Sequence, residues 1–191
     1  MHKSKRGLFE ICMGVLFLAC ACVFWQQNSA DARAAATASS AMLAAFNAQI
    51  MPSTAAENPQ KTPAACDESV DICGVLTIPA LSLQLPIQAD YSAELLQNAP
   101  CRYPAFQNGD AKQIFCAHNY KGQFGDLQKL AVGDAVFFVD ANGIEQHYTV
   151  SKVTTIAEDD VAALTADGCD LALFTCAQNE RRRVLVCCQN V

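Results

Sequence analysis

The 191-residue chain has few charged residues, and those it has are not predominantly basic. Charged side chains make up 17 % of the sequence, and 13 Lys and Arg against 19 Asp and Glu give a net charge of −6. A surface of this sign does not attract a phosphate backbone, so nucleic-acid binding is not expected. The sequence also has no internal repeat and no sign of a second domain. One globular domain behind an N-terminal apolar run is therefore expected.

Patterns for metal binding and thiol redox chemistry are also missing. The 3 histidines and 11 cysteines form no cluster with the spacing of metal ligands, so we expect no metal and no cofactor. The adjacent Cys187 and Cys188 suggest a thiol redox protein, but the C-x-x-C motif of such proteins is absent. The cysteines outside the apolar run show no small disulfide-framework pattern either.

The N-terminus has the pattern of a membrane segment, because a short basic tip precedes an apolar run that ends at Trp25. A basic flank stays in the cytoplasm. We therefore predict a transmembrane signal-anchor over residues 1–25, with a single pass through the cell membrane and an extracellular domain behind it. The run is short for a membrane span, so two alternatives stay open. These are a signal peptide cleaved near Ser29-Ala30 and a lipoprotein modified at Cys20 or Cys22.

Residues 26–73 have the composition of a stalk and linker. The segment is rich in Ala, Ser, Thr, Asn and Gln, and its prolines lie in the second half. The first half has helical propensity but few apolar residues to bury, which predicts an exposed stalk helix. The second half is expected to be extended linker.

The pattern changes at Gly74, where short strand signals begin. Leu81, Leu83 and Leu85 alternate with polar residues, as a half-buried strand requires. Asn142-Gly143 between two strand-like runs indicates a hairpin. Further strands are predicted at 113–118, 135–140, 144–153, 170–176 and 183–189, with short helices at 91–98 and 159–166. This density of short strands and turns predicts a mainly β domain over 74–191, a closed or nearly closed barrel.

Three side chains with complementary chemistry lie at predicted strand ends. Cys176 ends one strand and His118 ends another, and His118 is the one histidine expected at a strand-to-loop junction. Arg183 begins the last strand, seven residues after Cys176, so that a tight connection would bring both to one face. Each residue alone is more often structural. Together, a thiol, an imidazole and a guanidinium suffice for acyl transfer.

The segments that hold these residues resemble the sortase family, in the same order along the chain. The first segment is GVLTIPALSLQLPI, the second is IFCAHNYKGQFGDLQKLAVGD and the third is LALFTCAQNERRRVLV. The second is similar to the family's histidine segment, and the third to its Leu-x-Leu-x-Thr-Cys signature before an Arg-started strand. The resemblance implies a closed eight-stranded β-barrel with short helices, and Cys176, His118 and Arg183 as catalytic residues.

The resemblance also implies a reaction and its partners. Sortases are cysteine transpeptidases of Gram-positive cell surfaces, so the expected substrate is a sorting signal similar to Leu-Pro-x-Thr-Gly, cut between Thr and Gly. The acyl group would pass to an amine of a cell-wall precursor or a pilin. Neither a lid motif nor a C-terminal membrane segment is seen, which favours a non-pilin class resembling the His-Asn-Tyr variants.

Some residues near the site depart from the family pattern or have open roles. Ala117 stands where a glycine is common, and its methyl group is expected to crowd the backbone beside the site. Asn119 and Thr175 are candidate substrate-binding residues, Asn119 by direct contact and Thr175 indirectly from the opposite strand face. Cys116 and Cys187 have the parity of the catalytic residues, so a silencing disulfide with Cys176 is an open possibility.

Two other functions compete with transpeptidation. A cysteine peptidase with the same residues would pass the acyl group to water, and a catalytically silent barrel would bind sorting signals without turnover. Adding an amine nucleophile to a sorting-signal peptide separates these alternatives.

Overall fold

The computed structural model describes residues 2–50, 72–104, 112–160, 162, 164, 169–176 and 182–191, without the side chains of 2–9, 49, 50 and 176. The chain divides into two units, Met1–Ala34 and Ala35–Val191. The predicted extended linker and half of the helix predicted at 159–166 lie outside the described residues.

The N-terminal segment is one continuous helix, α1 (His2–Ile50). Within the described residues it is the one helix long and apolar enough to cross a membrane, over Glu10–Ala48. Its second part was expected to be exposed, and this is wrong for three side chains: Ala35, Ser39 and Phe46 are buried. The Ser39 hydroxyl donates a hydrogen bond of 3.0 Å to the carbonyl of Asn98. This part of the helix is therefore anchored to the domain that follows.

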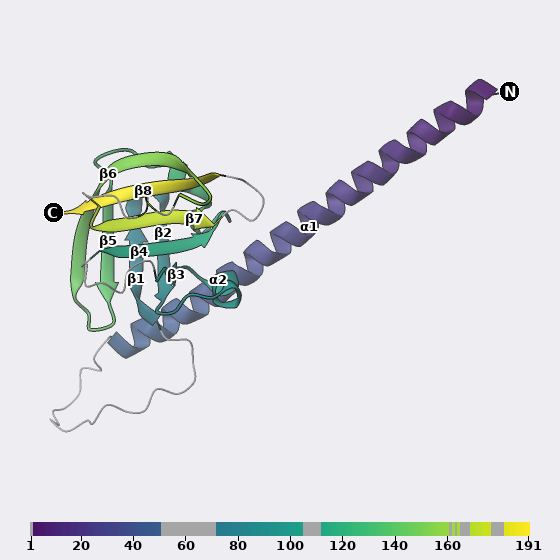
Figure 1. The fold of residues 1–191 in the computed structure, drawn as a ribbon. Coiled ribbons are helices and arrows are strands. Elements are labelled where there is room, and N and C mark those ends of the chain that lie inside the picture. The colour runs from purple at the N-terminus through teal and green to yellow at the C-terminus, as the bar shows by residue number, and fades with distance from the viewer. Residues whose placement is uncertain are drawn as a thin grey trace. The chain divides into compact units, whose positions relative to one another are not determined.

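Eight strands close into a barrel, as predicted (Figure 1). Their order around the barrel is β1-β2-β3-β4-β7-β8-β6-β5, and β1 pairs with β5 to close it. The strands are β1 (Ile72–Ile78), β2 (Leu83–Gln88), β3 (Cys101–Arg102), β4 (Gln113–His118), β5 (Ala135–Asp140), β6 (Glu145–Ala157), β7 (Leu171–Cys176) and β8 (Arg182–Asn190). The short helices are η1 (Pro79–Leu81), α2 (Ala93–Asn98) and η2 (Phe124–Lys129).

The turn between the first two strands differs from the sequence prediction. Pro79 begins the 3-10 helix η1, and Ser82 follows it in the left-handed conformation with φ 52°. A proline fixes its own φ and donates no ladder hydrogen bond, so it favours this helical turn. Leu81 therefore lies in η1, and the strand begins at Leu83.

Strands β4, β7 and β8 bury side chains on both faces. Alternate residues such as Phe115, Ala117 and Leu173 belong to the cluster inside the barrel. Their neighbours on the opposite face, including Cys116 and Phe174, belong to a second cluster. Because β4 and β7 are parallel and covered on both sides, they are apolar almost throughout. The second, outer face has the parity of the candidate catalytic residues.

Candidate active site

The candidate cysteine and histidine are direct neighbours in the sheet. β4 and β7 run parallel, and their register ends with His118 beside Cys176. On the other side of β7, Phe174 pairs with Leu185 of antiparallel β8. Arg183 also lies on β8, two residues beyond the last pair of this register. The register thus makes His118 and Cys176 neighbours, with Arg183 on the adjoining strand.

His118 is buried at the end of β4, with only 5 % of the residue exposed. Its ring lies against that of Tyr120, with centroids 5.0 Å apart and planes at 32°. The ring nitrogen Nε2 is buried and has no hydrogen-bond partner among the described residues. Burial lowers the pKa of His118 below its usual 6.5, because the charged imidazolium loses solvation. Burial thus disfavours the imidazolium, and the ring has a nitrogen available for proton transfer.

Arg183 is held by two contacts that leave part of its guanidinium uncommitted. The guanidinium carbon lies 5.6 Å from the ring centroid of Phe174, which precedes Cys176 by two residues. Nη2 lies 3.6 Å from a carboxylate oxygen of Glu158, whose side chain is 56 % exposed. Nε is buried and finds no acceptor within the described part of the chain. A planar cation with a free donor can stabilise a developing oxyanion.

The turn after β4 makes contacts with His118 that sequence reasoning missed. The side-chain oxygen of Gln123 accepts a hydrogen bond of 3.2 Å from the backbone N–H of His118. Asn119, the predicted substrate contact, is exposed in this turn. The Phe174 contact was within reach of sequence reasoning, because Phe174 has the same strand parity as Cys176. The Gln123 contact was not, because it depends on the path of the turn.

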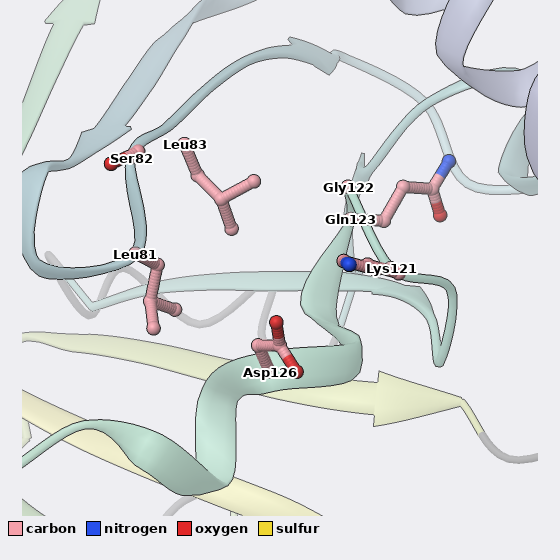
Figure 2. Close-up of a pocket in the computed structure, with 7 residues that line it drawn as sticks. All are labelled: Leu81, Ser82, Leu83, Lys121, Gly122, Gln123 and Asp126. Carbon is pink, nitrogen blue, oxygen red and sulfur yellow. The ribbon is translucent and has the colours of Figure 1, made fainter.

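A cavity of about 420 Å³ is lined in part by this turn (Figure 2). It is lined by Leu81, Ser82, Leu83, Lys121, Gly122, Gln123 and Asp126. Figure 2 shows the amide of Gln123 pointing away from Leu81 and Leu83. Gln123 thus lines the cavity and also contacts the backbone of His118 at the end of β4.

A family model decides what kind of barrel this is. The model described as "Sortase domain" matches residues 76–191, which covers β2 to β8 and all three candidate catalytic positions. The chain belongs to the sortase family. Members of this family are cysteine transpeptidases. Membership of the His-Asn-Tyr class stays a prediction. A search of curated proteins found no match to the sequence.

Solved sortase structures share this fold. Sortase A from Corynebacterium diphtheriae has a TM-score of 0.57 and 19 % identity, over 64 % of this chain and 61 % of that one. Sortase C1 from Streptococcus agalactiae has a TM-score of 0.55 and 28 % identity, over 66 % of this chain and 70 % of that one. Sortase A of Listeria monocytogenes has a TM-score of 0.56 and 18 % identity, over 63 % of this chain and 87 % of that one. The match to the present chain therefore spans less than two thirds of the Corynebacterium chain.

An open possibility about Cys187 is excluded, and an expectation about Ala117 is wrong. Cys187 is joined to Cys169 in a disulfide with Cα atoms 5.3 Å apart, so it is not the partner of Cys176. Its register explains this, because Cys187 lies beside Ala172, four residues before Cys176. Ala117 does not crowd the site, because its methyl group packs inside the barrel.

The adjacent cysteines of β8 do not form a redox pair. Cys187 is in the disulfide with Cys169, whereas Cys188 is buried inside the barrel. Burial raises the pKa of Cys188 to about 12, which leaves almost no thiolate at neutral pH. Cys188 is therefore an unreactive core residue.

Thr175 supports the sheet from inside the barrel. It is 3 % exposed, and its hydroxyl oxygen accepts a hydrogen bond of 3.2 Å from the backbone N–H of Val184. We expect Thr175→Val to lower the free energy of unfolding by about 1 kcal/mol, because the partly buried N–H of Val184 loses its acceptor. Urea unfolding checks this, with Thr175→Ser as the control that keeps the hydroxyl. Equal stability of the valine and serine variants would contradict it.

The buried histidine should change the pH dependence of catalysis by the sortase. Protonating neutral His118 costs more in the folded protein than in water, so its pKa lies below 6.5. A second proton therefore enters the thiol–imidazole pair only at lower pH. We expect the acid limb of kcat/KM to have an apparent pKa below 6.5, measured while circular dichroism reports an intact fold. An acid limb at or above 6.5 contradicts this assignment.

Proposed function

We propose that this sortase is a membrane-anchored cysteine transpeptidase that cleaves a sorting signal similar to Leu-Pro-x-Thr-Gly and transfers the acyl group to an amine. The observation that carries the proposal is the strand register that makes Cys176 and His118 neighbours, with Arg183 on the adjoining strand. The acceptor would be an amine of a cell-wall precursor or a pilin. No metal or cofactor enters this mechanism.

The first half-reaction forms a thioester. The thiolate of Cys176 attacks the threonine carbonyl carbon, and the oxyanion accepts hydrogen bonds from the guanidinium of Arg183. The carbon–nitrogen bond to glycine then breaks, and the protonated imidazole of His118 gives its proton to the leaving amine. The acyl group stays on the sulfur, and His118 is left neutral.

The second half-reaction reverses the roles of the same groups. The incoming amine attacks the thioester carbonyl while neutral His118 accepts its proton. Collapse of the tetrahedral intermediate breaks the carbon–sulfur bond, and Cys176 leaves as a thiolate. The enzyme thus regains the thiolate–imidazolium pair from which it began.

This mechanism leaves two origins for the thiolate. With ordinary pKa values of ~8.5 for a thiol and ~6.5 for an imidazole, about one per cent of sites hold both charges at pH 7. Burial of His118 makes this fraction smaller, because it lowers the imidazole pKa. The positive charge of Arg183 acts in the opposite direction, since a nearby cation favours the thiolate. We propose that Arg183 compensates for the burial of His118.

α1 supports the anchoring part of the proposal. Its span from Glu10 to Ala48 is long and apolar enough to cross a membrane. The basic tip with Lys3, Lys5 and Arg6 lies before this span, which orients the N-terminus to the cytoplasm and the barrel to the outside. We propose residues 1–25 as the membrane anchor, 26–73 as stalk and linker, and 74–191 as the catalytic barrel.

A peptide assay tests the function directly. The full chain in detergent is incubated with a quenched Leu-Pro-x-Thr-Gly peptide library, with and without triglycine, and the products are identified by mass spectrometry. Transpeptidation predicts a ligated product that increases with triglycine concentration. Acid product alone would establish a peptidase, and peptide binding without turnover would establish a silent barrel.

A further inference from the structure

Gln123 lies beside the end of β4, where β4 is no longer paired with β3. The pairing of β3 with β4 reaches only Cys101 beside Cys116, two residues before His118. The carbonyl of Ile114 accepts a hydrogen bond from Tyr103 on this side of β4. Backbone groups of alternate strand residues point the same way, so the N–H of His118 also faces this side. It has no β3 residue opposite it, and a buried N–H needs an acceptor.

The side chain of Gln123 supplies that acceptor. Its oxygen lies 3.2 Å from the His118 nitrogen, and the residue is only 2 % exposed. Its side-chain nitrogen is buried and has no hydrogen-bond partner among the described residues. Placing a polar group inside the protein with one donor unsatisfied is costly. The hydrogen bond with His118 therefore offsets part of the free-energy cost of burying the Gln123 amide. An apolar residue at position 123 would not have this cost.

The turn that carries Gln123 is closely fitted. The carbonyl of Tyr120 accepts hydrogen bonds from the backbone N–H groups of Gln123 and Gly125, at 3.0 and 3.1 Å. A Cβ atom on Gly125 would lie 2.7 Å from this carbonyl oxygen, so the close approach requires glycine. Tyr120 also lies against the imidazole. One turn thus contacts both the ring and the backbone of His118.

We propose that Gln123 is a positioning residue for His118: it fixes the last residue of β4 so that the imidazole stays beside Cys176. The inference rests on the proposed function for its catalytic consequence. Proton transfer requires the imidazole within hydrogen-bond reach of the sulfur and of the leaving amine. A strand end that frays by one residue would lose this placement without loss of the barrel.

The test compares substitutions that remove or keep the acceptor. Gln123→Met has a similar shape and no oxygen, so we expect kcat to fall by about 10- to 100-fold while KM changes little. Gln123→Glu keeps an oxygen at this position and should recover most of the lost kcat. Gln128→Met, an exposed glutamine of η2, is the matched control and should leave kcat unchanged. Thermal unfolding reports whether each variant folds.

A second readout does not depend on turnover. Hydrogen exchange of the His118 backbone amide, followed by NMR on the full chain in detergent, should become faster by about tenfold or more in Gln123→Met than in Gln123→Glu. Unchanged exchange would overturn the contact, and faster exchange with unchanged kcat would overturn the positioning role. If wild type shows no turnover, the proposed function fails and the exchange measurement still decides the contact. Should the methionine variant not fold, Gln123→Asn, which is one methylene shorter, replaces it with the same expectations.

Discussion

Replacing Cys176 with alanine is expected to lower the rate of sorting-signal cleavage by at least about 10³-fold, because the variant has no nucleophile for the thioester. The barrel should stay folded, since an alanine at the end of β7 keeps the strand. Substrate binding should also remain, because the substitution removes only the sulfur atom. The measurement is kcat and Kd for one Leu-Pro-x-Thr-Gly peptide in both proteins.

Cys73→Ala is the matched control for this prediction. Cys73 lies on β1, which pairs with β2 and β5 and not with the strands of the candidate site. We expect it to retain wild-type kcat. Activity that survives in Cys176→Ala under reducing conditions would remove Cys176 from the mechanism. Equal losses in both variants would point to a stability effect instead.

Arg183→Ala is expected to lower kcat/KM by about 10²- to 10³-fold, the usual effect of removing one oxyanion donor. The guanidinium lies over Phe174 and near Glu158, with Nε uncommitted among the described residues. Arg183→Lys should remain well below wild type, because an ammonium has neither the planar stacking surface nor the fixed donor geometry. A lysine variant with full activity would reduce the role of Arg183 to that of a positive charge.

Arg182→Ala separates this role from the general charge of the turn. Arg182 is exposed on the neighbouring position of β8, which has the opposite parity. A surface substitution there should change neither activity nor stability appreciably. If Arg182→Ala and Arg183→Ala lose activity equally, then the turn acts through its charge, and the stacked guanidinium is not the stabilising group.

Strand periodicity predicted most of the fold, and the predicted strand ends guided the choice of site residues. The apolar runs of β4 and β7 predicted buried strands, and both are found with the predicted bounds at their carboxyl ends. The places of His118, Cys176 and Arg183 at predicted strand ends then selected these three residues before any pairing was known. The register that makes His118 and Cys176 neighbours was not predictable, because parallel pairing depends on contacts distant in sequence.

Other features depend on geometry that a sequence does not express. The Cys169–Cys187 disulfide joins residues separated by 18 positions, and connectivity cannot be read from cysteine spacing. Ala117 was expected to crowd the site, but the side of the strand it faces makes it part of the barrel core. The Gln123 contact needs the folded turn. Each of these features depends on which segments of the chain the fold brings into contact.

The most direct test of the account is to trap the thioester. The full chain is incubated with a sorting-signal peptide without any amine, quenched in acid, digested and analysed by mass spectrometry. We expect the acyl portion of the peptide on the fragment that contains Cys176, and its release as ligated product when triglycine is added. An adduct on another cysteine, or ligated product formed without any adduct at Cys176, would contradict the account.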